Sequence, residues 1–342
     1  MGWRSVTNDA IMPKTGLPLL QSRNSRTVET TEMCWTGMGL SLYEIAGLRM
    51  NMRCMMLVGL CALVHSVLSV SVIAQNPDWN ALSPRKLHSG LNEIQVKYDG
   101  ELRRLVVVVP KTFDKAKNYP ILFCFHGAGG NADKQVARWR RHVDSRNLIL
   151  IGVDAVQSLK KWNFKEGFHV VNHDDVGLIR EAIKALISNG LADAKAIYAT
   201  GHSSGGLFCY RLAKESALLA TVCPMSCGMA KGAHDPDENT TPVHLMQVIG
   251  DRDKSYLGTT NPKVTMHSAE QRMAVWRAFN ECKSQPVMKA HGTEIKVRTY
   301  TNSDGIELAI CEAKDQGHHL RLDLRDAADI IALDFMLKHR KK

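Results

Sequence analysis

The order of apolar segments predicts an α/β fold, with a mostly parallel central sheet and helices on both of its faces. Segments of strand character alternate with segments of helical spacing through most of residues 90–342. This alternation is typical of strand–helix–strand units, whose strands run parallel. An Asp-Gly pair at 99–100 separates two apolar runs and predicts a β-hairpin, which indicates an antiparallel edge. No repeat or linker interrupts these residues, so we expect a single domain.

The individual elements follow from the periodicity of apolar residues and from the turn residues between them. Strands are expected, in chain order, at 94–98, 102–110, 120–125, 148–153, 196–200, 218–225, 243–249, 295–300 and 306–311. Helices are expected at 133–145, at 176–187, from the turn at 201–205 to about residue 216, at 266–279 and at 323–337. Asp174 or Asp175 is the expected N-cap of the helix at 176–187, because a carboxylate there can accept a hydrogen bond from a free N–H of the first turn.

The first 74 residues differ in character from the rest of the chain. Residues 1–49 show no sustained periodicity, and we expect an N-terminal extension without a structural role, or a start site assigned too early. An apolar run at 54–73 follows a basic residue and ends in small residues. This pattern predicts a signal peptide at 50–74, cleaved after Ala74, although the run is also long enough for a membrane anchor. The domain at 75–342 is therefore expected to be secreted or periplasmic, or anchored to a membrane.

The charge pattern bears on possible partners. Lys and Arg total 44 against 34 Asp and Glu, and most of the excess lies in 75–342. Surfaces that bind nucleic acids combine clustered basic residues with aromatic side chains. The densest basic cluster, at 338–342, follows a predicted helix and contains no aromatic residue. We therefore expect no nucleic-acid partner, and no stable membrane partner unless 54–73 is retained.

Six cysteines lie within 75–342, an even number that permits disulfides in an exported protein. They are Cys124, Cys209, Cys223, Cys227, Cys282 and Cys311. Cys282 with Cys311 is the preferred pair, whereas Cys124 and Cys209 stand in predicted core elements and are expected to be free. Cys223 and Cys227 have no partners at the spacing of a zinc site, so no metal is expected there.

The sequence Gly201-His202-Ser203-Ser204-Gly205 lies between an expected strand and an expected helix. In this context Gly-x-Ser-x-Gly indicates a nucleophile elbow, a strained turn that exposes a serine hydroxyl at the edge of a sheet. The two glycines leave room where a Cβ would collide with a neighbouring strand or helix. Ser203 is therefore the candidate nucleophile.

A serine nucleophile needs a base, and the base needs a third group to orient it. In this architecture the acid and then the histidine follow the serine, each after a later strand. Asp251 and Asp253 follow the strand at 243–249, and His318 and His319 follow the strand at 306–311. Position alone leaves both pairs of alternatives open.

The oxygen of a tetrahedral intermediate needs two backbone N–H donors. Ser204, directly after the nucleophile, is expected to provide one. The second is expected from the glycine-rich loop at 126–131, with Ala128 preferred and Gly127 or Gly129 as alternatives. No Gly-Lys-Ser/Thr follows this loop, so it does not fit a phosphate-binding loop.

These stretches resemble the polyhydroxybutyrate depolymerase and feruloyl/acetyl-xylan esterase group of secreted α/β-hydrolases. The resemblance rests on 125–130, Trp162-Asn163, 174–177, 197–213, 250–253, Trp276 with Asn280 and Cys282, Gly317-His318 and the helix at 326–335. It implies the α/β-hydrolase fold and a chemistry without a metal or an organic cofactor. In similar enzymes the acid stands three residues after a glycine and the base directly after one, which selects Asp253 and His318. Candidate substrate-binding residues are His126, Trp162, His202 and His319, although Trp162 is equally suited to a core position.

The chain also departs from that group. Ile249-Gly250 stands where similar enzymes usually carry His-Gly, and His319-Leu320-Arg321 stands where they usually carry a tryptophan. The acyl and alcohol parts of the substrate therefore cannot be transferred from the resemblance. We expect a secreted serine esterase that hydrolyses polyhydroxyalkanoate oligomers or feruloyl or acetyl esters of plant-type polysaccharide.

Two alternatives to the esterase share the same fold. One is a serine peptidase or another acyl hydrolase with the same triad, although a peptidase of this fold more often carries a larger gating domain. The other is a non-catalytic exported binding protein, which has to be considered because fold alone does not determine function. The complete set of catalytic residues disfavours it.

Overall fold

A computed structural model of the protein describes residues 77–341, apart from 157 and 169–172. The chain divides into two units, 1–72 and 73–342, and the fold given below is that of the second unit alone. The predicted N-terminal extension at 1–49 and the predicted signal peptide at 50–74 lie outside the described residues.

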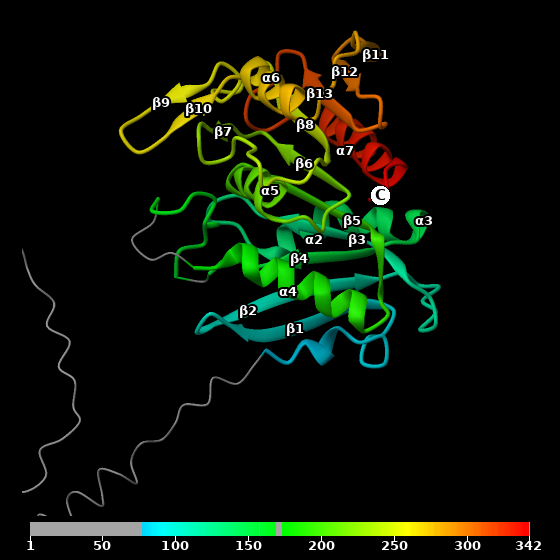
Figure 1. The fold of residues 1–342 in the computed structure, drawn as a ribbon. Helices are drawn as coiled ribbons and strands as arrows, with labels where there is room; N and C mark the ends of the chain where they lie inside the picture. The colour runs from blue at the N-terminus through cyan, green and yellow to red at the C-terminus, as the bar shows by residue number, and fades with distance from the viewer. Residues whose placement is uncertain (1–76, 157, 169–172, 342) are drawn as a thin grey trace, which may run out of the picture. The chain divides into compact units, whose positions relative to one another are not determined.

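Within the described residues, ten strands form one sheet (Figure 1). In spatial order they are β1 (Gly90–Tyr98), β2 (Glu101–Val109), β4 (Ile149–Val153), β3 (Tyr119–Phe125), β5 (Ala192–His202), β6 (Thr221–Met225), β8 (His244–Gly250), β13 (Glu307–Ala313), β12 (Ile295–Thr301) and β11 (Val287–His291). The strands from β4 to β13 pair in parallel, whereas the strands at both edges pair antiparallel. The predicted mostly parallel sheet with an antiparallel edge is confirmed.

Helices cover both faces of this sheet and bury two separate apolar clusters against it. One face carries α4 (Asp175–Ser188), α5 (Ser204–Glu215) and α6 (Ala269–Phe279), and the other carries α2 (Ala132–Trp139), α3 (Val143–Arg146) and α7 (Leu322–Lys338). Short 3-10 helices stand at Trp79–Leu82 and Arg140–His142. A small separate sheet consists of β7 (Met229–Ala230), β10 (Thr265–His267) and β9 (Thr259–Thr260).

The opening hairpin has the turn that its sequence predicts. Asp99 and Gly100 both have a positive φ, 51° and 77°, and they connect paired residues Tyr98 and Glu101. A two-residue connection with both φ angles positive matches the right-handed twist of the flanking strands. The hairpin therefore forms a regular antiparallel edge, and β2 joins it to the parallel part of the sheet.

Two predicted helices differ from those observed. The expected helix at 133–145 is interrupted at Arg140–His142, yet its apolar residues still face one cluster, which explains why the spacing looked continuous. The expected helix at 266–279 begins at Ala269, because Ser268 and Gln271 form a capping box there. The residues before Ser268 pair as β10 instead.

The two candidate caps of α4 have different roles. Asp174 accepts a hydrogen bond from the Gly177 N–H at 2.7 Å and is the N-cap. Asp175 is buried and forms an ion pair with the equally buried Arg103, at 2.8 Å between Nη2 and Oδ1. Arg103 also donates to the backbone oxygen of Asp154, so this pair fixes α4, β2 and the end of β4 together.

The six cysteines of the described residues are all free and buried. Cys209, Cys227 and Cys282 belong to the cluster under α4, α5 and α6, and Cys124, Cys223 and Cys311 belong to the cluster under α7. The predicted disulfide between Cys282 and Cys311 is therefore wrong, because the two side chains pack on opposite faces of the sheet. The prediction of free, buried thiols at Cys124 and Cys209 is confirmed.

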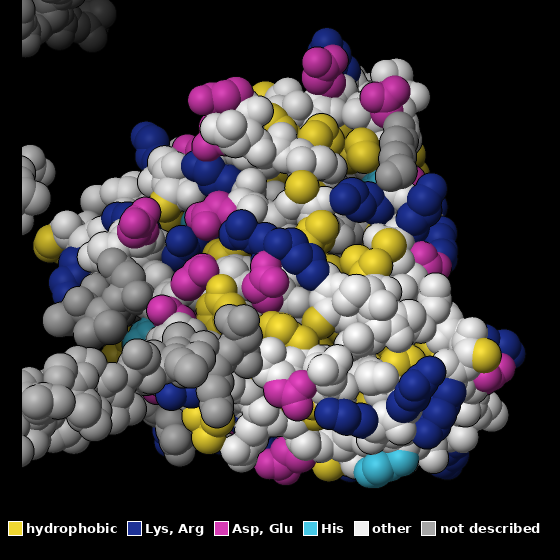
Figure 2. Space-filling model, turned by 60° about the horizontal axis from the view of Figure 1, so that its bottom comes forward, with side chains coloured by type: hydrophobic (Ala, Val, Ile, Leu, Met, Phe, Trp, Pro, Cys, Tyr) yellow, Lys and Arg dark blue, Asp and Glu magenta, His cyan; other side chains and the backbone are white. Residues whose placement is uncertain are grey.

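Figure 2 shows one face of the molecule, on which Lys and Arg side chains are interspersed with Asp and Glu side chains. Such mixing gives no continuous basic stripe on this face. In the part of the chain that the structure describes, no helix has the length and apolar character needed to cross a membrane.

Candidate active site

Ser203 occupies a sharp turn between the end of β5 and the start of α5. Its φ is 56° and its ψ is −115°, a strained conformation for a residue with a side chain. The turn is held by a hydrogen bond from the Ser203 N–H to the Met225 oxygen, at 2.9 Å, and by one from the Leu207 N–H to the Ser203 oxygen, at 3.0 Å. The structure thus has the strand–turn–helix arrangement that exposes a serine at the edge of a sheet.

The two outer glycines of this turn are required by close backbone contacts. A Cβ on Gly201 would lie 2.4 Å from the Gly205 oxygen, and a Cβ on Gly205 would lie 2.3 Å from the Phe125 oxygen. Real Cβ atoms do not approach an oxygen this closely, so any side chain would force β3, β5 and α5 apart. The glycines therefore allow the close packing that places Ser203.

The glycine-rich loop after β3 lies beside Ser203. A Cβ on Gly127 would be 3.4 Å from the Ser203 Cβ. The Gly129 N–H donates to the Lys160 oxygen and the Gly130 N–H donates to the Gly127 oxygen, both at 2.9 Å. Gly129 is therefore unsuited as an oxyanion donor, because its N–H already has an acceptor.

The remaining N–H groups of this region are available. Within residues 77–341, gaps excepted, the N–H groups of Gly127, Ala128 and Ser204 donate no hydrogen bond. Ala128 and Ser204 are the predicted donors, and Gly127 stays the alternative to Ala128. Ser204 is also the first residue of α5, where free N–H groups and the helix dipole favour negative charge.

The candidate acid and base are hydrogen-bonded to each other. The Nδ1–H of His318 donates to Asp253 Oδ2 at 2.9 Å, and the other oxygen of Asp253 accepts bonds from the N–H and the hydroxyl of Ser255, both at 2.8 Å. Burial raises the pKa of Asp253, but the hydrogen bonds from His318 and Ser255 outweigh it and lower that pKa to about 2. Asp253 is thus a buried carboxylate that stays ionised, while Asp251 has no bond to either histidine.

Arg272 stabilises the loop that carries the candidate acid, a contact that the sequence did not predict. This α6 side chain is only 1% exposed, and no carboxylate pairs with it among the described residues. Its Nη1 donates to the backbone oxygens of Ser255 and His267, at 2.9 and 3.0 Å. Ser255 is the residue that holds Asp253, so Arg272 connects α6 to the acid loop. A basic residue beside Met273 and Trp276, on the apolar side of a predicted helix, was the available signal.

Three histidines gather next to the nucleophile. The Nε2–H of His202 donates to the backbone oxygen of His318 at 3.1 Å. The His202 ring stacks on that of His319, with centroids 5.1 Å apart and planes 16° apart, and it meets the His318 ring edge to face at 4.9 Å. Burial lowers the pKa of His202 to about 4, so this ring is neutral at pH 7. His202 and His319 therefore flank the candidate base.

His202 connects Ser203 with His318. It precedes Ser203 in the chain, and its ring donates a hydrogen bond to the backbone oxygen of His318. Among the described residues, no hydrogen bond joins the Ser203 hydroxyl to the His318 ring. In free enzymes such bonds are often long and tighten only when substrate binds. No group of three or more His, Cys, Asp or Glu side chains in this part of the chain is arranged to hold a metal ion.

His126 and Trp162 lie behind the glycine-rich loop. Trp162 is completely buried, stacks on Phe208 and donates from Nε1 to the His126 oxygen at 2.9 Å. A contact between Trp162 and substrate is therefore excluded by its core position. The His126 ring borders a cavity, but its Nδ1–H donates to the Gly127 oxygen and its Nε2 accepts from the Ala155 N–H. His126 thus shapes the loop and has no free hydrogen-bonding group for a ligand.

Comparison with solved structures identifies the fold. The chain aligns with an acetyl xylan esterase from Aspergillus awamori with a TM-score of 0.52 and 14% identity, over 72% of this chain and 100% of that one. It aligns with the poly(3-hydroxybutyrate) depolymerase LpqC from Bordetella parapertussis with a TM-score of 0.52 and 15% identity, over 78% and 94% of the two chains. The fold is that of the α/β-hydrolases.

Sequence comparison points to the same group. A feruloyl esterase B from Piromyces equi is 24% identical over 229 residues, which cover 63% of this chain and 42% of that protein. The matched region thus spans less than half the length of the curated relative. No protein-family model matches the chain. The chain is similar to esterase-like α/β-hydrolases, as the sequence motifs predict.

Proposed function

We propose that this protein is a serine hydrolase of carboxylic esters. The observation that carries the proposal is the hydrogen bond between His318 and the buried Asp253, at the sheet edge where the strained Ser203 stands. This acid–base pair, a nucleophile elbow and a loop with free N–H groups are the parts that acyl transfer needs. The similarity to a feruloyl esterase, an acetyl xylan esterase and a polyhydroxybutyrate depolymerase supports an ester as the substrate.

In the first step the Ser203 oxygen attacks the ester carbonyl carbon while His318 Nε2 takes the hydroxyl proton. Asp253 holds the opposite nitrogen of the ring and stabilises the imidazolium that forms. The carbonyl oxygen becomes an anion, which the N–H groups of Ala128 and Ser204 bind. Each such donor contributes about 3 kcal/mol to the stability of the transition state.

The intermediate then collapses, the bond to the alcohol breaks, and His318 returns its proton to the alcohol oxygen. The acyl group remains on Ser203. In the second half, His318 takes a proton from water, the hydroxide attacks the acyl carbon, and the acid leaves as Ser203 regains its proton. The reaction thus consumes one ester and one water, and His318 transfers the proton in each half.

The substrates that we propose are polyhydroxyalkanoate oligomers or feruloyl or acetyl esters of polysaccharide. The names of the three similar proteins support these classes. We also propose export of the domain at 75–342, which the signal-peptide pattern at 50–74 supports. N-terminal sequencing of the protein from culture medium or periplasm would test this, and a first residue of Gln75 is expected.

The decisive experiment compares the full chain with its Ser203→Ala variant on a panel of esters. The panel contains p-nitrophenyl acetate and butyrate, methyl ferulate, acetylated xylan and a hydroxybutyrate oligomer. We expect turnover of at least one ester by the wild type, and a loss of about 10⁴-fold or more in the variant. Ser204→Ala is the matched control, because it removes a neighbouring hydroxyl and keeps the backbone N–H.

An inert wild-type protein, together with no labelling of Ser203 by a fluorophosphonate probe, would overturn the esterase proposal. The binding-protein alternative would then take its place. Cleavage of a peptide library in the absence of ester hydrolysis would favour the peptidase alternative instead.

A further inference from the structure

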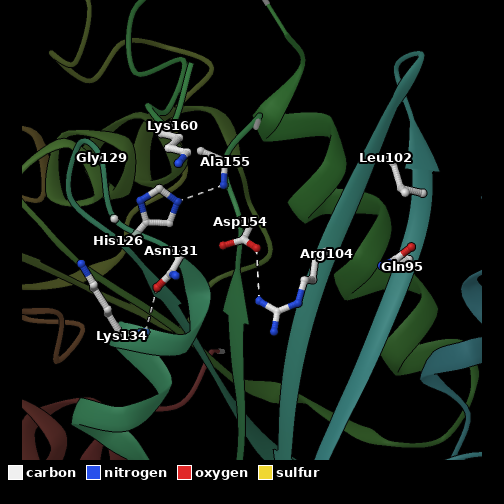
Figure 3. Close-up of a pocket in the computed structure, with 11 residues that line it drawn as sticks. Gln95, Leu102, Arg104, His126, Gly129, Asn131, Lys134, Asp154, Ala155 and Lys160 are labelled. Atoms are coloured by element: carbon white, nitrogen blue, oxygen red, sulfur yellow. Dashed lines mark hydrogen bonds and ion pairs between the residues drawn. The ribbon is translucent and has the colours of Figure 1, made fainter. Parts of the chain in front are cut away.

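A cavity of about 480 Å³ lies beside the glycine-rich loop (Figure 3). Its walls come from the carboxyl ends of β3 and β4, the first residues of β2 and the facing part of β1. Gly129, Gly130 and Asn131 of the loop form part of the wall. The cavity therefore opens at the same edge of the sheet as Ser203. Ligands of α/β sheets bind at this edge.

The order of strands separates the cavity from the candidate base. Ser203 follows β5, His318 follows β13 on one side of β5, and the cavity lies at β3, β4 and β2 on the other side. The leaving alcohol must face His318, because it receives its proton there. A group that extends from the reacting carbon to the opposite side belongs to the acyl part of the ester.

One wall of the cavity carries more negative than positive charge. Arg104 contacts three carboxylates, those of Glu93 at 2.6 Å, Asp133 at 2.9 Å and Asp154 at 3.3 Å. Asp154 also accepts a hydrogen bond from the Ala132 N–H at 2.6 Å, at the start of α2. The single positive charge of Arg104 is thus more than matched by carboxylates, so this wall offers a ligand no free cation.

The wall next to the loop is different. Lys134 and Lys160 line it, and within the described residues neither ammonium group has an ion-pair or hydrogen-bond partner. In Figure 3 they flank His126 and Asn131, across Asp154 from Arg104. Gln95 and Asn131 also line the cavity, and in that part of the chain neither side-chain amide nitrogen has an acceptor. The cavity thus offers a ligand free donors, two of them cationic.

The backbone of Lys160 is bonded to the glycine-rich loop. Its φ is 46°, in the left-handed region, and its backbone oxygen accepts the Gly129 N–H at 2.9 Å. Its own N–H donates to the Val156 oxygen at 2.8 Å. These bonds place the start of the Lys160 side chain beside the loop that carries Ala128.

We propose that this cavity binds the far end of an acyl group that carries a carboxylate, so that the preferred substrates include half-esters of dicarboxylic acids. The proposal rests on the esterase function proposed above and specifies its acyl part. Lys134 and Lys160 pair with the carboxylate, and the amides of Gln95 and Asn131 donate to its oxygens. Both lysines are exposed, and a single exposed ion pair is weak, so specificity depends on the two together.

The test compares monoethyl succinate, glutarate and adipate with the corresponding neutral primary amides, using the full chain. For each chain length the measured quantity is the ratio of kcat/KM for the half-ester to kcat/KM for the amide. We expect this ratio to exceed one in the wild type and to fall about three- to tenfold in Lys134→Gln/Lys160→Gln, with the amide unaffected. The fall should shrink at high salt, because salt screens exposed charges.

Lys111→Gln is the matched control. Lys111 is an exposed lysine two residues after the end of β2, at the opposite edge of the sheet from the cavity. Its ratio is expected to equal that of the wild type. An unchanged ratio in the double variant, or an equal loss for half-ester and amide, would overturn the proposal.

A failure of the esterase function gives a distinguishable result. If the wild type hydrolyses no ester, binding of free glutarate to the full chain is measured by calorimetry, with glutaramide for comparison. Binding of glutarate that is lost in Lys134→Gln/Lys160→Gln and retained in Lys111→Gln would support the cavity as a carboxylate site. No binding, or equal binding by the double variant, would overturn it.

Discussion

The two halves of the candidate site are built by different means. Around Ser203 the backbone of β3, β5 and α5 approaches so closely that a Cβ on Gly205 would lie 2.3 Å from an oxygen. Around His318 one backbone approach is equally close, since a Cβ on Gly250 would lie 2.2 Å from the Gln316 oxygen. The His318 ring itself is oriented by side-chain hydrogen bonds, which connect it to Asp253 and then to Ser255 and Arg272. The position of Ser203 should therefore be sensitive to added volume, and the orientation of His318 to changes of charge and of hydrogen-bonding groups.

The largest effect is expected from a change of charge in the acid–base half. Asp253→Asn keeps the shape of the acid but removes the carboxylate that orients His318. We expect kcat for the preferred ester to fall about 10³- to 10⁴-fold. The free energy of unfolding at pH 7 should also fall, because the ionised carboxylate stabilises the fold through its hydrogen bonds. Asp251→Asn is the control, because Asp251 has no bond to His318, and it should keep near-normal activity. Equal losses in the two variants would show that Asp253 is not the orienting acid.

A change of volume should affect the turn that positions Ser203. Gly205→Ala places a methyl group against the Phe125 oxygen, and we expect a loss of about 3 kcal/mol or more in the free energy of unfolding by urea, or failure to fold. Gly317→Ala is the matched change beside His318, where an added Cβ would have no atom within 4 Å. Its free energy of unfolding should change by less than about 1 kcal/mol. Similar losses in both variants would remove the contrast between the two halves.

The smallest expected effect concerns acid sensitivity. Burial lowers the pKa of His202 and of His234 to about 4, against about 6.5 in the unfolded chain. The unfolded chain therefore binds more protons between pH 6.5 and 4, and the stability of the fold is lost as the pH falls through this range. For His234, which is completely buried, the loss should be about 1–3 kcal/mol by pH 4.

Urea unfolding of the wild type and of His234→Gln at pH 7, 5.5 and 4 measures this term. The variant should be less stable at pH 7, and its free energy of unfolding should depend less on pH. An equal dependence on pH between 7 and 4 in the wild type and the variant would argue against His234 as the source.

The carboxylate of Asp253 affects stability at lower pH. Its pKa is lowered to about 2 in the fold, so its contribution to the free energy of unfolding is complete above about pH 4 and is lost from there towards pH 2.

Chain order predicted the loops on which the candidate triad lies. Each loop follows a buried parallel strand, and apolar runs of this kind are recognisable without a structure. The order left Asp251 and His319 as alternatives, and the choice of Asp253 and His318 came from the resemblance to the esterase group. Contacts across the sheet were not predictable in this way. The spacing of Cys282 and Cys311 contains no information about the face on which each side chain packs. The support of Asp253 by Arg272 was not predictable either, because it depends on a tertiary contact between a helix and a loop.

Features at the edges of the fold were also missed. Strand β11 is exposed along nearly its whole length, and Val287–His291 does not alternate between apolar and polar residues. Its pairing with β12 therefore left no pattern in the sequence. Trp162 suited either a core or a pocket position, and only its complete burial decides between the two.

The distribution of cysteines gives the protein built-in reporters of local opening. Thiolates react with alkylating reagents, and burial raises the pKa of Cys282 to about 11 and that of Cys311 to about 12. Each thiol becomes reactive only when its surroundings open, and local openings differ in free energy across a structure. Because Cys282 and Cys311 lie under opposite faces of the sheet, their alkylation rates would measure separately how often each helical layer leaves the sheet.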